Sequence, residues 1–360
     1  MTEATLSQSA IFSARPTLRI AGQEDARLST QLLALRMEEH EGGLSHLELR
    51  LNNWVATEGS PELAFDAGST LRLGAELAVY SGDAAAPTEI FQGRVSALEM
   101  VCDYGKPPEL VVLAEDALGT ARRARRTRVY TDQSPAEVAR AIAAELGLGI
   151  DVTALEQPRG TWAQLDETDL GFLRRLLARF DADLQVVGQR LQVAPRGEVQ
   201  RGSLELTLYS QLARVRITAD LAGQVSAVSV SGWNARDGAP VSGQASALAH
   251  GGPGSGRSGP DWAGDALGAR PLHLAGPAVH SDEEARAVAQ AALDQRARRF
   301  VRAEGVAEGN ARLRVGCHVR LAGIAPQFDN SYYVVQARHL FDQRQGYRTE
   351  FQAETAYLGT

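Results

Sequence analysis

The segment 71-LRLGAELAVYSG-82 recurs in altered form as 313-LRVGCHVRLAG-323, and this pair of segments decides the expected fold. In each segment a glycine, Gly74 or Gly316, stands before a stretch in which apolar and polar side chains alternate, and a further glycine closes the segment. Alternation with a period of two is typical of a β-strand that buries one face. The pair therefore predicts two copies of one strand-and-turn unit.

Two further echoes follow the paired segments in the same order. Residues 92–94 read QGR and residues 336–338 read QAR, while residues 114–117 read AEDA and residues 353–356 read AETA. Three matches in one order and at similar spacing indicate an internal duplication. The sequence therefore predicts two similar β-barrel domains in one chain, and a ring of three such chains would present six similar faces.

The stretch between the two predicted barrels has a helical pattern. Ser134 and Pro135 suit the N-cap and the first position of a helix that Gly147 would end. A second amphipathic helix is expected to begin near Asp166, because Leu and Phe recur after it at three- and four-residue spacing. Two short strands are expected to follow, so this part predicts a small α/β domain.

The expected fold class is mainly β with an α/β insert. Residues 1–120 would form the first β-barrel domain, residues 121–200 the α/β insert domain and residues 201–360 the second β-barrel domain. Within the last part, residues 238–276 are rich in Gly, Ser, Pro and Ala, which is typical of a flexible surface loop. Residues 282–301 predict a long helix with a capping serine before it.

The charge of the chain narrows the classes of function. The formal net charge is −7, from 44 acidic and 37 basic side chains. A general nucleic-acid-binding protein would usually be basic, so no nucleic-acid specificity is expected. No apolar stretch reaches about 18 residues and no signal-peptide pattern opens the sequence, so we expect assembly in the cytoplasm without stable membrane insertion.

Two segments of biased composition need an interpretation. The basic run 122-RRARRTR-128 is either a solvated linker or an inter-subunit patch of ion pairs, and without interleaved aromatic residues it is weak evidence for nucleic acid. The glycine tract 251-GGPGSGRSG-259 neither follows a clear strand nor promptly opens a helix. It is therefore interpreted as a loop and not as a phosphate-binding cradle.

We expect no catalytic, cofactor-binding or metal-binding residues. His40 and His46 lie near several glutamates, but their spacing matches no metal motif and favours a solvated turn. Asp166, Glu167 and Asp169 could suggest paired catalytic carboxylates, yet the dipole of the helix they would begin sufficiently explains negative charge there. The two cysteines stand far apart in the sequence and in no metal spacing.

Four segments carry a family resemblance. The segment 164-QLDETDLGFLRRL-176 is similar to the pattern Q-x-x-E-[ST]-D-x-x-F-L-x-R-L, and it is the most specific match. Support comes from Ser134-Pro135 with its helix, from 228-VSVSGWN-234 and from the closing 346-GYRTEF-351. From about residue 70 to its end, the chain thus resembles the late-control gene D proteins of phages and the hub part of type VI secretion valine-glycine-repeat spike proteins.

The resemblance implies a structural baseplate or tail hub of a contractile injection machine. In that family the hub is a trimer whose two similar barrels per chain form a pseudo-six-fold ring, which joins a hexameric inner tube protein to a trimeric spike. The resemblance therefore implies a homotrimer without catalysis, with baseplate wedge components as further partners. The assembled protein would be part of a phage tail or a phage-tail-like particle.

One departure from the spike-bearing relatives bears on the partners. Those relatives continue into an oligonucleotide-binding-fold domain and a β-helical needle, whereas this sequence ends at Thr360, just past the second predicted barrel. A separate trimeric spike protein is therefore expected. Two alternatives from other classes are a cell-wall-degrading tail-tip enzyme, which needs a pocket with convergent titratable groups, and a receptor-binding module, which an exposed row of aromatic residues would favour.

Overall fold

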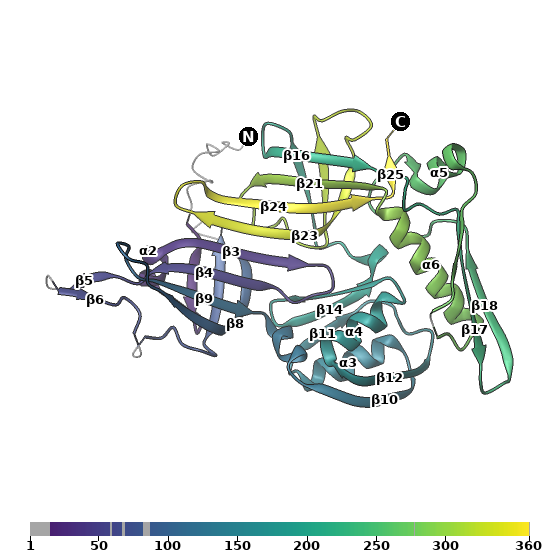
Figure 1. Ribbon diagram of the computed structural model, residues 1–360, viewed down its shortest axis with the longest axis horizontal. Helices are drawn as coiled ribbons and strands as arrows, with labels where there is room; N and C mark the ends of the chain where they lie inside the picture. Colours follow the sequence, from purple (N-terminus) through teal and green to yellow (C-terminus); the bar gives the residue numbers. More distant parts are fainter. Residues whose placement is uncertain (1–14, 58–59, 67–68, 82–86, 277, 360) are drawn as a thin grey trace, which may run out of the picture.

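A computed structural model describes residues 15–57, 60–66, 69–81, 87–276 and 278–359 of the chain. The protein is mainly β, as the sequence predicts, and its largest element is a sheet of 13 strands (Figure 1). Ten of these strands fall into two groups of five, which we call block 1 and block 2. Block 1 consists of β3 (Leu32–His40), β4 (His46–Asn52), β9 (Glu109–Glu115), β8 (Thr88–Val101) and β7 (Glu76–Ser81). Block 2 consists of β16 (Leu212–Ala219), β21 (Val301–Glu308), β24 (Gly346–Thr355), β23 (Ser331–Asp342) and β22 (Cys317–Ala322).

The two blocks have the same strand order and are joined edge to edge. Within each block, the neighbours follow in the order in which the strands are given above. Antiparallel pairing of β23 with β3 joins block 2 to block 1, so that the two blocks share one continuous sheet. Block 1 is extended by β1 (Thr17–Ile20) and β2 (Gln23–Glu24), and block 2 by β15 (Gly202–Thr207), which runs parallel to β22.

The repeated glycines, Gly74 and Gly316, have the same backbone conformation and equivalent hydrogen bonds in the two blocks. Gly74 has a φ of +79° and donates its N–H to the carbonyl of Val95 at 2.9 Å. Gly316 has a φ of +86° and donates to the carbonyl of Val334 at 3.0 Å. A positive φ suits glycine and few other residues, which explains why both turns carry one before the strand begins.

Two β-bulges also coincide between the blocks. In β3 and β16 the register shifts near the start of the strand, and in β8 and β23 it shifts near the middle. The shifts lie at Leu32/Ala34 and Leu212/Arg214, and at Val95/Ala97 and Val334/Gln336. Bulges redirect a strand and are built into a fold at set positions. The two blocks therefore repeat one pattern of backbone pairing, as an internal duplication would produce.

The register corrects part of the sequence alignment. Residues 114–117 and 353–356 do correspond, because Ala114 faces Val95 just as Ala353 faces Val334. The match of residues 92–94 with 336–338 is wrong, since Gln336 follows the bulge and corresponds to Ala97. The segments 71–74 and 313–316 lie in turns, not in strands. Gly82, which closes the first segment, lies outside the described residues.

Neither block is closed into a ring by strand pairing among the described residues. One isolated bridge joins Leu212, at the start of β16, to Leu208, which donates to Ala322 of β22; beyond it the outer edge of β16 has no strand partner there. The predicted pair of β-barrels therefore stays a prediction, while the mainly β class and the repeated strand order are established.

An α/β unit lies beneath the sheet in the view of Figure 1. It contains two small sheets, of β10 (Arg125–Gln133) with β12 (Gly160–Thr168), and of β11 (Gly149–Val152), β14 (Arg190–Pro195) and β13 (Ala182–Val187). Helices α3 (Pro135–Glu145) and α4 (Asp169–Ala178) pack between them. The start of α4 was expected near Asp166; that boundary is wrong, because Asp166 adopts a φ of +49° within β12 and Thr168 caps the helix.

Residues 238–276 were predicted to be a flexible loop, and that prediction is wrong. They contain β18 (Ala239–Ala245), β19 (Arg257–Ser258), helix α5 (Gly259–Leu267) and β20 (Pro271–Leu274). Strand β17 (Ala227–Asn234) pairs with β18 and β20, and α6 (Asp282–Arg298) packs on the resulting sheet. The glycines there reflect close packing: a Cβ at Gly251 would collide with the ring of Tyr357, and one at Gly256 with the backbone of Leu358.

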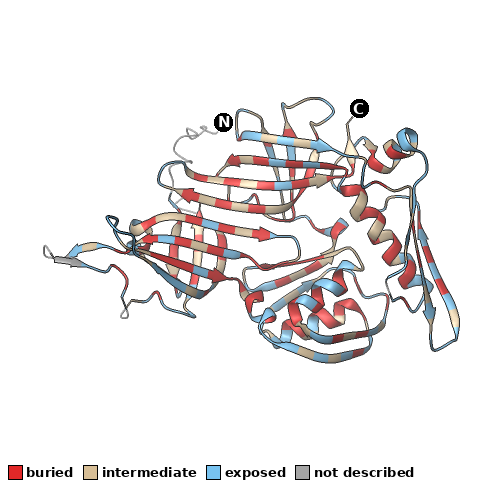
Figure 2. Cartoon of the chain, viewed as in Figure 1, coloured by how far each residue is buried: buried red, intermediate tan, exposed pale blue. Residues whose placement is uncertain are grey.

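The buried residues are distributed over each of these units (Figure 2). Separate apolar clusters fill block 1, the α/β unit, block 2 and the layer between α6 and the β17–β18–β20 sheet. Burial of apolar area is the main stabilising contribution to each unit. A few apolar side chains cross the boundaries, such as Phe341 and Tyr347 of block 2 in the cluster of block 1 and Leu44 in that of the α/β unit. Ion pairs with deeply buried members also join the units, and these pairs form the candidate site.

Candidate functional site

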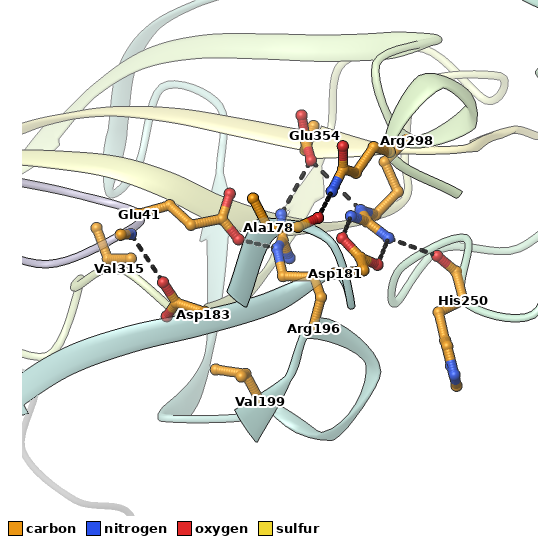
Figure 3. Close-up of polar contacts among 12 residues, drawn as sticks. Glu41, Ala178, Asp181, Asp183, Arg196, Val199, His250, Arg298, Val315 and Glu354 are labelled. Carbon is orange, nitrogen blue, oxygen red and sulfur yellow. Dashed lines mark hydrogen bonds and ion pairs between the residues drawn. The ribbon is translucent and has the colours of Figure 1, made fainter. Parts of the chain in front are cut away.

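Two buried arginines lie where the α/β unit, both blocks and α6 meet (Figure 3). Arg196 is in the short turn η2 (Arg196–Glu198) and its side chain is 2% exposed. Arg298 is in the last turn of α6 and its side chain is 3% exposed. A charge removed from water to this extent is strongly destabilising unless it is paired. Their partners therefore hold the units in one arrangement.

Arg196 binds carboxylates from both blocks. Its Nε donates to Glu41 in the turn between β3 and β4, and its Nη2 donates to Glu354 on β24 at 2.9 Å. The guanidinium also lies over the ring of Tyr333 on β23, 3.1 Å from the ring centroid. A planar guanidinium can pair with two carboxylates and stack on an aromatic face at once, which a lysine could not do.

Arg298 connects α6 to the α/β unit. Its two terminal nitrogens donate to the carboxylate of Asp181, at 2.8 and 2.5 Å, and one of them also donates to the carbonyl of His250 at 3.0 Å. Its Nε lies 3.6 Å from Glu354, which brings this pair into contact with the partners of Arg196. The acidic neighbours Asp181, Glu354 and Glu41 outweigh the cost of burial and raise the pKa of Arg298.

The turn between β3 and β4 is clamped to the α/β unit from two sides. The buried carboxylate of Asp183 accepts the N–H of Gly42 at 2.8 Å and a bond from Arg201 at 2.8 Å. Arg174 on α4 donates to the carbonyls of Gly42 and Gly43, both at 2.7 Å. Hydrogen bonds that involve a charged group are stronger than neutral ones, so this turn is firmly held.

A second ion pair, between buried Glu39 and partly buried Arg314, joins block 1 to block 2. Glu39 on β3 accepts two bonds from Arg314, at 2.8 and 2.6 Å, and one from the N–H of Val315 at 2.6 Å. Burial alone would raise the pKa of Glu39, but the charge and hydrogen bonds of Arg314 lower it below its usual value. Burial and the Arg314 charge also lower the pKa of the neighbouring His339 to about 3, so this histidine is neutral.

One carboxyl of the cluster titrates near neutral pH. Burial raises the pKa of Glu41 to about 7; Arg196 opposes the rise, while the carboxylates of Asp183 and Glu354 add to it. Perturbed pKa values gather at active sites but also in structural ion-pair networks. Here the perturbed group lies among ion pairs that connect units of the fold, so the structural interpretation fits better.

A cleft of about 930 Å³ opens beside the cluster. It is lined by the β3–β4 turn, by α4, by the end of α6 and by β21, and Arg299 and Arg302 contribute their side chains to it. His40 and His46 also line it, but His40 lies 2.9 Å from Glu38 and His46 lies 3.8 Å from Glu115. The cleft therefore contains cations and anions, without a hydrogen-bonded nucleophile and base.

The structure divides the predicted solvated turn around residues 38–46 into two environments. Both histidine side chains are about half exposed, as expected. Glu39 is instead buried and paired with Arg314, so the solvated-turn interpretation is wrong for it, whereas the side chain of Glu41 is 34% exposed and reaches buried Arg196. Sequence spacing could not distinguish these residues, because their arginine partners lie more than 150 positions further along the chain.

The most specific family motif, residues 164–176, spans the junction of β12 and α4, where Gln164 forms a set of hydrogen bonds that we call the Gln164 clasp. The buried amide of Gln164 donates to the carbonyl of Glu167 and to the carboxylate of Asp169, both at 2.9 Å. Thr168 caps the helix, and Glu167 pairs with Arg175 at 2.7 Å. The acidic residues that could have suggested catalysis thus serve the strand-to-helix junction.

The basic run 122–128 is not a linker. Most of it is in strand β10, and its arginines form ion pairs within the chain, among them Arg126 and Arg128 with Glu145, each at 2.5 Å. The linker interpretation is therefore wrong. The inter-subunit patch stays a prediction, because the ion pairs that the structure shows join residues of the same chain.

The described part of the chain shows no group of three or more His, Cys, Asp or Glu side chains placed to hold a metal ion. Cys102 is exposed, whereas Cys317 is buried, and burial raises its pKa to about 11. In the same residues, no helix has both the length and the apolar composition needed to cross a membrane.

The fold is that of phage tail proteins. The 43 kDa tail protein of prophage MuSo2 from Shewanella oneidensis aligns with a TM-score of 0.68 at 12% identity, over 95% of this chain and 98% of that one. A tail protein from Neisseria meningitidis MC58 aligns with a TM-score of 0.63 at 12% identity, over 96% of this chain and all of that one. An E. coli component of the type VI secretion system, described as structurally similar to T4 bacteriophage tail proteins gp27 and gp5, aligns with a TM-score of 0.61 at 13% identity, over 95% and 78% of the two chains.

The sequence itself identifies the family. Residues 55–343 match the family model described as the Alg8 N-terminal domain, and the chain belongs to this family. No curated protein sequence matches the chain.

Proposed function

We propose that this protein is the structural hub of a contractile injection machine, a homotrimer that adapts a six-fold inner tube to a three-fold spike. It carries out no reaction; its work is to hold neighbours in fixed positions. The proposal is supported by the likeness of the fold to tail proteins. The observation that carries it is the repetition of one five-strand block within a single continuous sheet.

The repeat is the feature that a symmetry adaptor needs. One chain with two similar blocks presents two similar surfaces, and three chains in a closed ring present six. In this proposal residues 1–120 and 201–360 are two barrel-type domains, and residues 121–200 form the insert between them. A hexameric inner tube protein would contact all six blocks, and a separate trimeric spike protein would contact each chain once.

The buried charge cluster has a clear role in such a hub. Buried ion pairs contribute less to stability than their number suggests, but they can favour one arrangement of the packed parts over others. Arg196 contacts both blocks from the insert, and Arg298 contacts the insert from α6. We infer that the cluster keeps the insert and the two blocks aligned when the particle contracts.

The same proposal covers location and further partners. The protein would assemble in the cytoplasm, contact baseplate wedge components and then leave the cell or remain in it as part of a phage tail or tail-like particle. It would bind no nucleic acid specifically, in keeping with its net charge of −7.

The test is the mass of the purified full-length chain, with and without the candidate tube and spike proteins. A trimer is expected from light scattering, and a ternary complex with a hexameric and a trimeric neighbour from native mass spectrometry. A chain that stays monomeric at high concentration and in the presence of both neighbours would overturn the proposal. Cell-wall hydrolysis by the pure protein would favour the enzyme alternative.

A further inference from the structure

We propose that copies of this chain join by pairing the free edge of β8 in one copy with the free edge of β16 in the next, in a register that the chain itself defines. This inference rests on the proposed hub function and names the surface and the partner, a second copy of the same chain. It follows from the one junction between blocks that the chain already contains.

That junction is the antiparallel pairing of β23 with β3. Ala337 lies opposite Glu39, and His339 lies opposite Met37. Both blocks have the same strand order and the same bulges, so β8 corresponds to β23 and β16 corresponds to β3. Each chain therefore contains one paired junction, β23 with β3, and two further edges, on β8 and β16, that could form the same junction with other copies.

The two unmatched edges are open in the described structure. Residues 97–101 of β8 pair with β9 on one side, while their other side, which corresponds to the β3-binding side of β23, has no strand partner there. Strand β16 pairs with β21 on one side and ends the sheet on the other. Open edges of this kind are ready templates for pairing with another chain.

Transferring the register of the internal junction gives the expected contacts. Leu98 of one copy falls opposite Ala219 of the next, and Met100 falls opposite Ile217. Asp103, just beyond β8, falls opposite Arg214, so an acid meets a base. Cross-strand apolar pairs and opposite charges are the contacts that stabilise antiparallel pairing, and the transferred register places both kinds together.

Exposure supports the same edges. Leu98 and Met100 are 36% and 47% exposed, whereas their counterparts in β23, Ala337 and His339, are fully buried. An apolar side chain left open at the position where its counterpart is covered marks a surface that awaits a partner.

The repeated turn adds a fourth contact. Val315 in the turn of block 2 is 1% exposed and lies in the same recess as Met37 and Glu39 of β3. Leu73, its counterpart in block 1, is 64% exposed. By the same transfer, Leu73 would pack against Ile217 of the next copy. The contact uses a different surface on each partner, so three copies can close into a ring.

Paired cysteines test the register in the full-length chain, in a background that carries Cys102→Ser. The variant Met100→Cys with Ile217→Cys should form disulfides between copies on mild oxidation, giving dimers and closed trimers on a denaturing gel. A Cβ separation near 4 Å favours such a bond, and directly opposite residues approach it. The matched control, Met100→Cys with Thr218→Cys, shifts the register by one residue, points the thiols to opposite faces and should give no cross-link.

The oligomeric mass of the Cys102→Ser parent separates the two possible failures. A trimeric parent without cross-links in the Met100/Ile217 variant, or with equal cross-linking in the control, would overturn this inference and leave the hub proposal standing. A parent that is monomeric alone and beside its tube and spike neighbours would overturn both.

A second variant keeps the inference testable if the cysteines perturb folding. Leu73→Asp changes an exposed side chain, so the melting temperature of the single chain should be unchanged. The dissociation constant of the trimer should rise roughly tenfold or more, as when a buried interface anchor is lost. An unchanged dissociation constant would count against the contact.

Discussion

The turn at residues 313–316 and its repeat at residues 71–74 have the same backbone and opposite surroundings. In block 2, Arg314 is bound to the buried carboxylate of Glu39, and Val315 is covered. In block 1, Arg72 and Leu73 are exposed. The local sequence specifies the conformation of the turn, but contacts with the neighbouring block decide how much the side chains of the turn contribute to stability. The turn of block 2 has these contacts within the chain, whereas the turn of block 1 lacks them and can bind a second copy.

Removal of the buried Glu39 carboxylate should have the largest effect. Glu39→Ala leaves the partly buried guanidinium of Arg314 and the N–H of Val315 without their acceptor, and we expect a loss of about 3 kcal/mol of unfolding free energy. Urea unfolding of the full chain measures it. The matched control is Arg72→Ala, where an exposed side chain is lost and a change within about 0.5 kcal/mol is expected. Equal losses in the two variants would contradict the comparison.

Truncation of the apolar side chain should also destabilise the turn of block 2 more than that of block 1, but the difference in unfolding free energy should be smaller than for the charged residues. Val315→Ala removes buried methyl groups from a packed site, and we expect a loss of about 2 kcal/mol. Leu73→Ala removes more carbon from an exposed site, yet it should change the stability of the single chain by less than about 0.5 kcal/mol. Thermal unfolding at concentrations too low for association checks this. If Leu73→Ala proves as costly as Val315→Ala, the turn of block 1 is already covered within one chain.

The sequence could reveal the repeat but not its full register. The turn glycines leave a local signal, because Gly74 and Gly316 both need a positive φ. The bulges leave none, so the match of residues 92–94 with 336–338 was misaligned. The predicted loop at 238–276 was wrong for a related reason: glycine is needed both for flexibility and for close packing, and composition alone does not separate the two. Gly251 is an example of close packing, because a Cβ there would collide with the ring of Tyr357.

The charge cluster was beyond sequence reasoning. Glu41 and Arg196 are 155 positions apart, and Asp181 and Arg298 are 117 apart, so no short motif connects them. Isolated charges such as these have the sequence pattern of ordinary surface residues. By contrast, the Gln164 clasp was found through its motif, because its partners lie within five residues of it.

The cluster should make stability depend on pH in a defined direction. The pKa of Glu41 is raised to about 7 in the folded chain from an ordinary 4.5, so its contribution is fully present below about 4.5 and is lost as the pH rises through 7. Glu41→Gln removes this titration. We expect a flatter decline of unfolding free energy between pH 4.5 and 7 in the variant, measured by urea unfolding across that range.

The control for the pH experiment is Glu38, a carboxyl on β3 three residues before Glu41. The pKa of Glu38 is lowered to about 2, since Arg338 and Arg36 outweigh the effect of its burial. Glu38→Gln should therefore leave the slope between pH 4.5 and 7 as it is in the parent chain. If both variants flatten the decline equally, another group titrates there, and the cluster does not report on the junction between the units.

The smallest effect should come from the insert, which has no repeated counterpart. Thr168→Ala removes the N-cap bond to Gly171, a change that typically costs about 1 kcal/mol, whereas Thr168→Ser keeps a hydroxyl and should cost less. Because Arg174 on the same helix donates to the β3–β4 turn, the loss should also weaken amide hydrogen-exchange protection at Gly42. If protection falls in α4 alone, the insert opens independently and the cluster does not couple it to block 1. If it falls in both, the polar junction transmits a local change from the insert to the repeated sheet.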